Sequence, residues 1–146
     1  MRFLRQIHTD FGVSVIALGG MPSALTSEYT ARDINVKLLE DPKPVHLIGI
    51  VDYDPAGDII ANSFKEQLSD TGLSSSSLST LIHPSHYTKD ELALFRFPLP
   101  KKDKTKLNLW LAKSGGIDGK AFGLESESMH PKKLYTLIEQ RILAIP

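Results

Sequence analysis

Two acidic residues, Asp52 and Asp54, directly follow the most apolar stretch of the chain, residues 45–51. Such a nearly continuous apolar stretch is typical of a central strand that is buried on both faces. Residues two apart on an extended segment point to the same side, roughly 6–7 Å apart along the strand. Both carboxylates can therefore serve one hydrated Mg²⁺ ion or a pair of ions, because this metal prefers oxygen ligands.

The residues after these acids favour a bound phosphate. Pro55 and Gly57 predict a sharp turn, followed by a helix over about residues 58–70. The start of that helix would present free amides and the positive end of its dipole. Metal plus phosphate is therefore the expected chemistry. The competing interpretation is structural: an ordinary strand-to-helix turn in which Asp54 or Asp58 caps the helix.

The elements that would position these residues follow an α/β pattern. Apolar, β-rich runs at 13–18, 45–51 and about 121–125 alternate with helix-like segments, and residues 78–82 are a further candidate strand. This pattern predicts a mainly parallel sheet of about four strands flanked by helices. Ligands collect at the carboxyl ends of parallel strands, which is where Asp52 and Asp54 are expected to lie.

Local sequence signals predict where several helices begin and end. Residues 2–9 resemble the tail of a helix, and Ser23 is a candidate N-cap for a helix that places Leu25, Tyr29, Arg32 and Val36 along one side. The Asp-Pro-Lys-Pro segment at 41–44 should end that helix. Further signals are a capping box at 88–91, a helix end at the glycines 115–116, and a proline at 131 that opens a terminal helix.

Composition places the chain among soluble globular proteins. The 146 residues are 41% apolar, with 17 basic and 17 acidic side chains and no cysteine. These values predict a single cytoplasmic domain over 1–146, and they exclude disulfides, thiolate metal sites and a generally basic nucleic-acid coat. No run approaches the ~18 apolar residues of a membrane span, so no membrane partner is expected. Residues 1–73 carry 6 basic against 10 acidic groups and residues 74–146 carry 11 against 7, which fits an acidic site with a basic rim or two ordinary solvated surfaces.

Two segments together carry a family resemblance. Leu-Gly-Gly-Met-Pro-Ser at 18–23 and Val-Asp-Tyr-Asp-Pro-Ala-Gly at 51–57 each follow a predicted strand. The chain thereby resembles the Toprim domain of the topoisomerase VI A subunit, whose relatives include the meiotic double-strand-break protein. The resemblance is clearest over residues 1–72, and its specific part is the Asp-x-Asp-Pro-x-Gly element.

The resemblance implies a Toprim fold that binds Mg²⁺ through the paired aspartates and a glutamate at the end of an earlier strand. No residue matches that glutamate, because the chain begins inside the helix that would follow it, so the domain is expected to be incomplete at its N-terminus. The tyrosine nucleophile of the family belongs to a separate winged-helix domain. Packing is accordingly the expected role of Tyr29, Tyr53, Tyr87 and Tyr135.

Two functional hypotheses follow from the resemblance. If Glu125, Glu127 or another chain supplies the missing acid, then Asp52 and Asp54, with Asp58 as a weaker third ligand, would hold Mg²⁺ against a DNA phosphate for metal-assisted phosphoryl transfer. This is a topoisomerase-like, isomerase activity that needs a partner subunit or a winged-helix domain, and a homodimer is compatible with it. Otherwise the domain is a non-catalytic DNA-binding or protein-interaction module. Primase-like nucleotidyl transfer is a third class.

Weaker signals lie in the second half of the chain. His83 and His86 have a spacing that zinc could use on a helix, but Pro84 between them predicts a loop, and no third ligand is near in sequence. The lysines between 101 and 106 could contact a nucleic-acid backbone, although a solvated face explains them more simply. Trp110 stands at helical spacing among leucines and is expected in the core.

Overall fold

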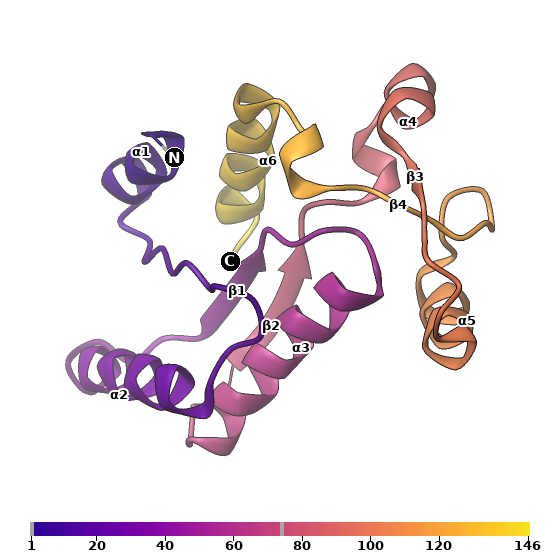
Figure 1. The fold of residues 1–146 in the computed structure, drawn as a ribbon. Helices are drawn as coiled ribbons and strands as arrows, with labels where there is room; N and C mark the ends of the chain where they lie inside the picture. The colour runs from indigo at the N-terminus through magenta and orange to yellow at the C-terminus, as the bar shows by residue number, and fades with distance from the viewer. Residues whose placement is uncertain (1, 74) are drawn as a thin grey trace.

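A parallel pair of strands forms the centre of the molecule. The computed structural model describes residues 2–73 and 75–146. Strand β1 (Val45–Gly49) pairs in parallel with β2 (Ser75–Thr80), and helix α3 (Pro55–Asp70) connects them. The two strand arrows point the same way in Figure 1, so both strands end on one side of the molecule. The loops that follow them are therefore neighbours.

Helix α2 (Ala24–Glu40) packs against α3 through a small apolar cluster. The cluster contains Ala31, Leu68 and Leu73. Ser23 caps the helix as predicted, since its side chain accepts the main-chain N–H of Thr26 at 3.1 Å. The helix ends at Glu40, before the Asp-Pro-Lys-Pro segment that was expected to end it.

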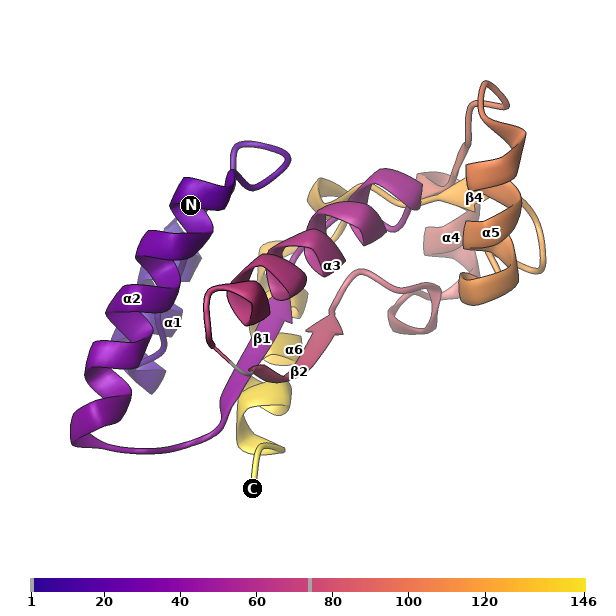
Figure 2. The ribbon, with the colours of Figure 1, turned by 90° about the horizontal axis from the view of Figure 1, so that it is seen from below.

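The second half of the chain forms the larger core. It contains the 3₁₀ turn η1 (Pro84–His86), α4 (Lys89–Phe95), β3 (Phe97–Pro98), α5 (Lys104–Ser114), β4 (Phe122–Gly123), the 3₁₀ turn η2 (Ser126–Ser128) and α6 (Pro131–Leu143). Helix α1 (Arg2–Phe11) packs on α6 and adds Ile7 to the same core. In Figure 2, α1 and α2 lie at one end of the molecule and α4 and α5 at the other, with α3 between them.

Local signals for helix boundaries are confirmed in this half. Thr88 and Glu91 form the predicted capping box at the start of α4. Gly115 ends α5 in the left-handed conformation, with φ at 81°, and Pro131 opens α6. The capping box and the glycine satisfy free main-chain groups within a few residues, and proline at the first helical position has no N–H to leave free, so the sequence alone specifies these boundaries.

The four-stranded parallel sheet is not found. Within the described residues the strands form two separate pairs, and β3 with β4 is antiparallel and only two residues long. Pro98 and Pro100 have no N–H to donate, and between them the N–H of Leu99 adds one further hydrogen bond, to the carbonyl oxygen of Ala121 at 3.0 Å. The fold class is thus mixed α/β with one parallel pair, and β1 is half-buried rather than enclosed on both faces.

One expectation about the N-terminal part was wrong. Residues 13–18 adopt neither helix nor strand, and Val15 is 44% exposed. A strand forms only where it pairs with a neighbouring strand, and the described sheet contains β1 and β2 alone. Residues 13–18 have no such pairing there, so their apolar character did not make them a strand. On α2, the side that carries Leu25, Tyr29 and Val36 is exposed, whereas Ala31 is buried and Ile34 and Leu38 pack against the apolar cluster shared with α3.

Among the residues that the structure covers, no helix combines the length and apolar character needed to cross a bilayer.

Candidate functional site

A pocket of about 250 Å³ lies where β1 and β2 end. We call it the aspartate pocket. Its walls come from the loop after β1, the start of α3, the loop after β2 and the end of α5. The side chains with chemistry among its lining residues are Asp52, Asp54, Asp58, His83 and Lys113. Three of the four metal ligands expected from the sequence are thus brought together at the carboxyl ends of parallel strands.

Asp54 opens helix α3 and caps it. Its Oδ1 accepts the main-chain N–H of Gly57 at 2.6 Å, and Pro55 occupies the first turn. The capping interpretation is therefore confirmed for Asp54. A cap uses one carboxylate oxygen, and among the described residues no hydrogen bond reaches the other, Oδ2.

Asp52 is held by a segment far along the chain. The main chain of Tyr53 forms an antiparallel bridge with Leu124, with N–H to O distances of 2.8 and 3.1 Å. This bridge places Ser126 so that its N–H donates to Asp52 Oδ1 at 2.7 Å. Asp52 Oδ2 accepts no hydrogen bond from the described part of the chain. Each aspartate of the pair thus keeps one oxygen for a ligand.

Gly57 is required by the close approach of α3 to this loop. A Cβ atom at position 57 would lie 2.1 Å from the main-chain oxygen of Asp52. Only glycine lets the helix start pass so near the strand end. The steric limit at position 57 therefore explains why the Asp-x-Asp-Pro-x-Gly element ends in glycine.

Asp58 is engaged by Lys113, a residue that the sequence analysis did not single out. The Lys113 Nζ lies 3.0 Å from both carboxylate oxygens of Asp58, and Asn62 Nδ2 donates to Oδ1 at 3.1 Å. A cation that used Asp58 as a ligand would have to displace this ammonium. The pair could be anticipated only from the packing of α3 on α5.

Glu125 does not line the pocket. It directly precedes η2, its side chain is exposed and makes no capping hydrogen bond, and its carbonyl oxygen accepts the N–H of Ser128. Glu127 is exposed as well. Within 2–73 and 75–146, no group of three or more acidic or histidine side chains is arranged to hold a metal ion unaided.

Tyr53, between the two aspartates, anchors the pocket to the core. Its hydroxyl donates to the carbonyl oxygens of Gly116 and Ser114 at 2.9 and 3.2 Å. Its ring meets Trp110 edge-on, with centroids 5.1 Å apart. Burial raises the pKa of the Tyr53 phenol above its ordinary value, so the group remains a neutral donor. Packing, as expected, is its role, and Trp110 is buried as predicted.

His83, like Lys113, lines the pocket although it was not among the residues predicted for the site. It follows β2 as Asp52 follows β1, so the same rule about strand ends could have found it. Its Nδ1 accepts the N–H of Ser85 at 3.2 Å, and its ring lies 5.5 Å from that of Tyr53. Burial and the nearby charge of His86 lower the pKa of His83. His86 instead contacts the carbonyl oxygen of Leu81 through Nδ1, at 2.8 Å.

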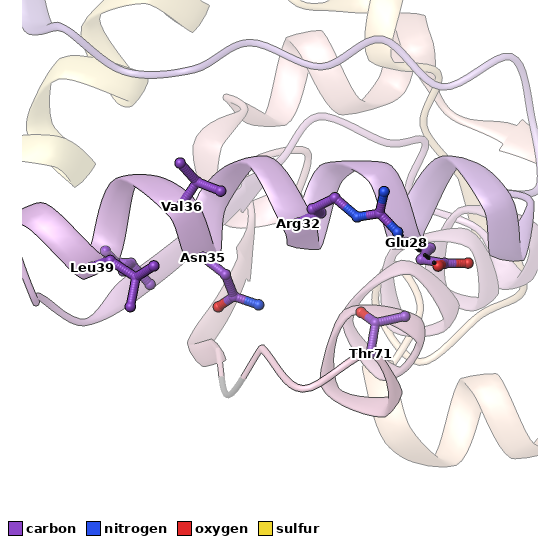
Figure 3. A pocket seen from close by; sticks show the side chains of 7 residues that line it. Glu28, Arg32, Asn35, Val36, Leu39 and Thr71 are labelled. Carbon is purple, nitrogen blue, oxygen red and sulfur yellow. Dashed lines mark hydrogen bonds and ion pairs between the residues drawn. The ribbon is translucent and has the colours of Figure 1, made fainter.

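A larger hollow, of about 520 Å³, runs along α2 and is shown in Figure 3. Its charged members Glu28 and Arg32 pair with each other at 3.4 Å, and Val36 and Leu39 supply apolar surface. The internal ion pair leaves no net charge to attract an ion. The aspartate pocket is therefore the stronger candidate for chemistry.

Comparison with protein-family models, with curated proteins and with solved structures found no match to this chain.

Proposed function

We propose that this chain is a Toprim-like, Mg²⁺-binding domain that acts on DNA by metal-assisted phosphoryl transfer. The observation that carries the proposal is the aspartate pocket, where Asp52 and Asp54 each keep one carboxylate oxygen at the end of a parallel strand pair. DNA is the proposed partner, and the cytoplasm is the proposed compartment. A partner subunit, a second copy of the chain or a winged-helix domain would supply the nucleophile.

The donor set suits Mg²⁺. This ion is usually bound by one or two carboxylates, several waters and substrate phosphates rather than by a full protein cage. Asp52 and Asp54 would be its ligands, held in place by the N–H groups of Ser126 and Gly57. When bound, the ion would neutralise charge on a phosphodiester during cleavage or rejoining. Asp58 would join only after releasing Lys113, and Glu125 is not among the residues that line the pocket.

Magnesium titration of Asn variants tests this proposal. Asp52→Asn and Asp54→Asn keep an oxygen that can accept the same main-chain N–H but remove the negative charge. We expect saturable Mg²⁺ binding by the unmodified chain in calorimetry, and binding about tenfold weaker in either variant. Thermal stability should change little, because asparagine is as good an N-cap as aspartate.

The matched control is Asp70→Asn, at the exposed far end of α3. It should leave Mg²⁺ affinity unchanged. Fluorescence polarisation with a labelled DNA duplex should show Mg²⁺-dependent binding that weakens with salt. Absence of saturable Mg²⁺ binding, or equal affinity in all variants, would overturn the proposal.

A non-catalytic interaction module is the second candidate. It is favoured by the exposed apolar side of α2, where Leu25, Tyr29 and Val36 could contact a protein partner. In that case the aspartates act only as structural acceptors. Asp54→Ala would then lower stability by about 1 kcal/mol through the lost cap, while Asp54→Asn would alter neither stability nor DNA binding.

A further inference from the structure

The aspartate pocket is also lined by two side chains that can donate hydrogen bonds and that the proposed metal site does not use. Lys113 is the one cationic side chain among the pocket's described lining residues, and His83 is the one imidazole. Lys113 comes from the end of α5, and His83 from the loop after β2. Two side chains that can donate hydrogen bonds, from separate elements, thus line the same 250 Å³ space as the acids.

Lys113 has donor capacity left after its ion pair. An ammonium group carries three N–H donors. The Nζ lies 3.0 Å from each oxygen of Asp58, which accounts for two of them. The side chain of Lys113 is 62% exposed, so the third N–H is open to a ligand or to solvent.

His83 has a defined tautomer when it is neutral. Its Nδ1 accepts the Ser85 N–H at 3.2 Å, so the ring proton must be on Nε2. The Ser85 hydroxyl lies 2.7 Å from the same Nδ1. Contacts with the rings of Tyr53 and His86, at 5.5 and 6.3 Å between centroids, restrict the imidazole. The Nε2–H is therefore an oriented donor without a partner among the described residues.

Charge decides when these donors can be used. The three aspartates and Lys113 leave a net charge of −2 on the pocket when His83 is neutral. That charge repels an anion, whereas one bound divalent cation brings the local sum to zero. The acids and the donors therefore suit two ligands of opposite sign that bind in a fixed order.

We infer that Lys113 and His83 form the phosphate-binding side of the aspartate pocket, which accepts a phosphodiester only after a divalent cation has bound. This inference rests on the proposed function, because Asp52 and Asp54 must first hold the cation. It adds the residues that would contact the non-bridging phosphate oxygens and the order of binding. Lys113 would contribute charge, and the Nε2–H of His83 would contribute direction.

The dinucleotide TpT is a suitable probe, since it carries one phosphodiester and no terminal phosphate. Its binding is followed by NMR chemical shifts, including the ring nitrogens of histidine. We expect TpT to bind the unmodified chain only when Mg²⁺ is present, and to shift the Nε2 resonance of His83. Lys113→Met should weaken TpT binding about tenfold, since a charge-assisted hydrogen bond is lost. The same variant should bind Mg²⁺ at least as tightly, because Asp58 is freed.

The His83 contribution is separated from its structural role by His83→Asn. Asparagine can still accept the Ser85 N–H but lacks the Nε2–H, and we expect TpT binding about fivefold weaker with unchanged Mg²⁺ affinity. His130→Asn is the matched control, because His130 Nδ1 accepts the Lys132 N–H at 3.2 Å outside the pocket. It should leave TpT binding unchanged.

The outcomes separate the two proposals. If Mg²⁺ binds through the aspartates but Lys113→Met and His83→Asn bind TpT like the unmodified chain, the inference is overturned and the proposed function stands. TpT binding of equal strength without Mg²⁺ overturns the inference in the same way. If Mg²⁺ does not bind at all, both proposals fall.

Discussion

Replacing Gly57 by alanine should have two opposite effects on stability, a gain in helix propensity and a steric clash with the main chain of Asp52. Alanine is favoured over glycine within a helix by about 1 kcal/mol, which alone would stabilise α3. A Cβ at this position would, however, lie 2.1 Å from the main-chain oxygen of Asp52 and 3.0 Å from its carbonyl carbon. Ordinary carbon–oxygen contacts begin at roughly 3.3 Å. The loop and the helix start must therefore separate by more than 1 Å.

The cost of that separation should exceed the gain in propensity. Overpacking a tight site costs about 1–3 kcal/mol, and the upper end applies because a main-chain oxygen cannot rotate away. The net loss is then about 2 kcal/mol, which corresponds to a fall of roughly 4–8 °C in melting temperature for a chain of this size. The shift would also disturb the N–H of Gly57 that Asp54 accepts at 2.6 Å, so Mg²⁺ affinity should fall with stability.

Urea denaturation followed by circular dichroism measures the effect, with Gly19→Ala as control. A Cβ at position 19 meets no atom within 4 Å, so that variant should change the free energy of unfolding by less than about 1 kcal/mol, in the stabilising direction. A Gly57→Ala protein as stable as the unmodified chain would refute the steric argument. So would a free energy of unfolding for Gly57→Ala that is no lower than that of the Gly19→Ala control.

Two further predictions concern contacts between elements. Ser27 is fully buried and donates to Gln67 Oε1 at 2.5 Å, so Ser27→Ala should lower the free energy of unfolding by about 1 kcal/mol in urea denaturation, and an unchanged value would contradict the assigned role of this bond. The hydroxyl of Tyr135 donates to Asp10 Oδ2 at 2.7 Å, and this bond raises the pKa of Tyr135 to about 12. The contact therefore stabilises the fold below pH 10 and loses that effect as the pH rises toward 12. An NMR titration should find that Asp10→Asn lowers the Tyr135 pKa toward its ordinary value; a pKa that stays near 12 in this variant would show that Asp10 is not the cause.

The cap of α3 was predictable from the sequence because its cause is local, although the helix begins at Pro55, earlier than the expected start near residue 58. Asp54 caps α3 through a residue three positions away, and Pro55 and Gly57 shape the same turn. The caps of α2 and α4 are equally short-range. A side chain that satisfies a main-chain group within a few residues needs no information from the rest of the fold.

The sheet was predicted poorly for the opposite reason. Residues 13–18 have the composition of a strand, but a strand forms only where a neighbouring strand supplies hydrogen bonds. In the described sheet β1 pairs with β2, and residues 13–18 pair with neither. The outward face of α2 shows the same limit, because apolar spacing marks a stripe but cannot say whether anything covers it.

The amino-acid sequence by itself determined the caps of α2, α3 and α4 and the position of Asp52 and Asp54 after a strand. Only the tertiary structure decided which groups face these acids. Ser126 reaches Asp52 across 74 positions, and Lys113 reaches Asp58 across 55. Such pairs depend on how α5 and the β4 segment pack beside the parallel strands. That packing is a property of the whole core, so no local pattern encodes it.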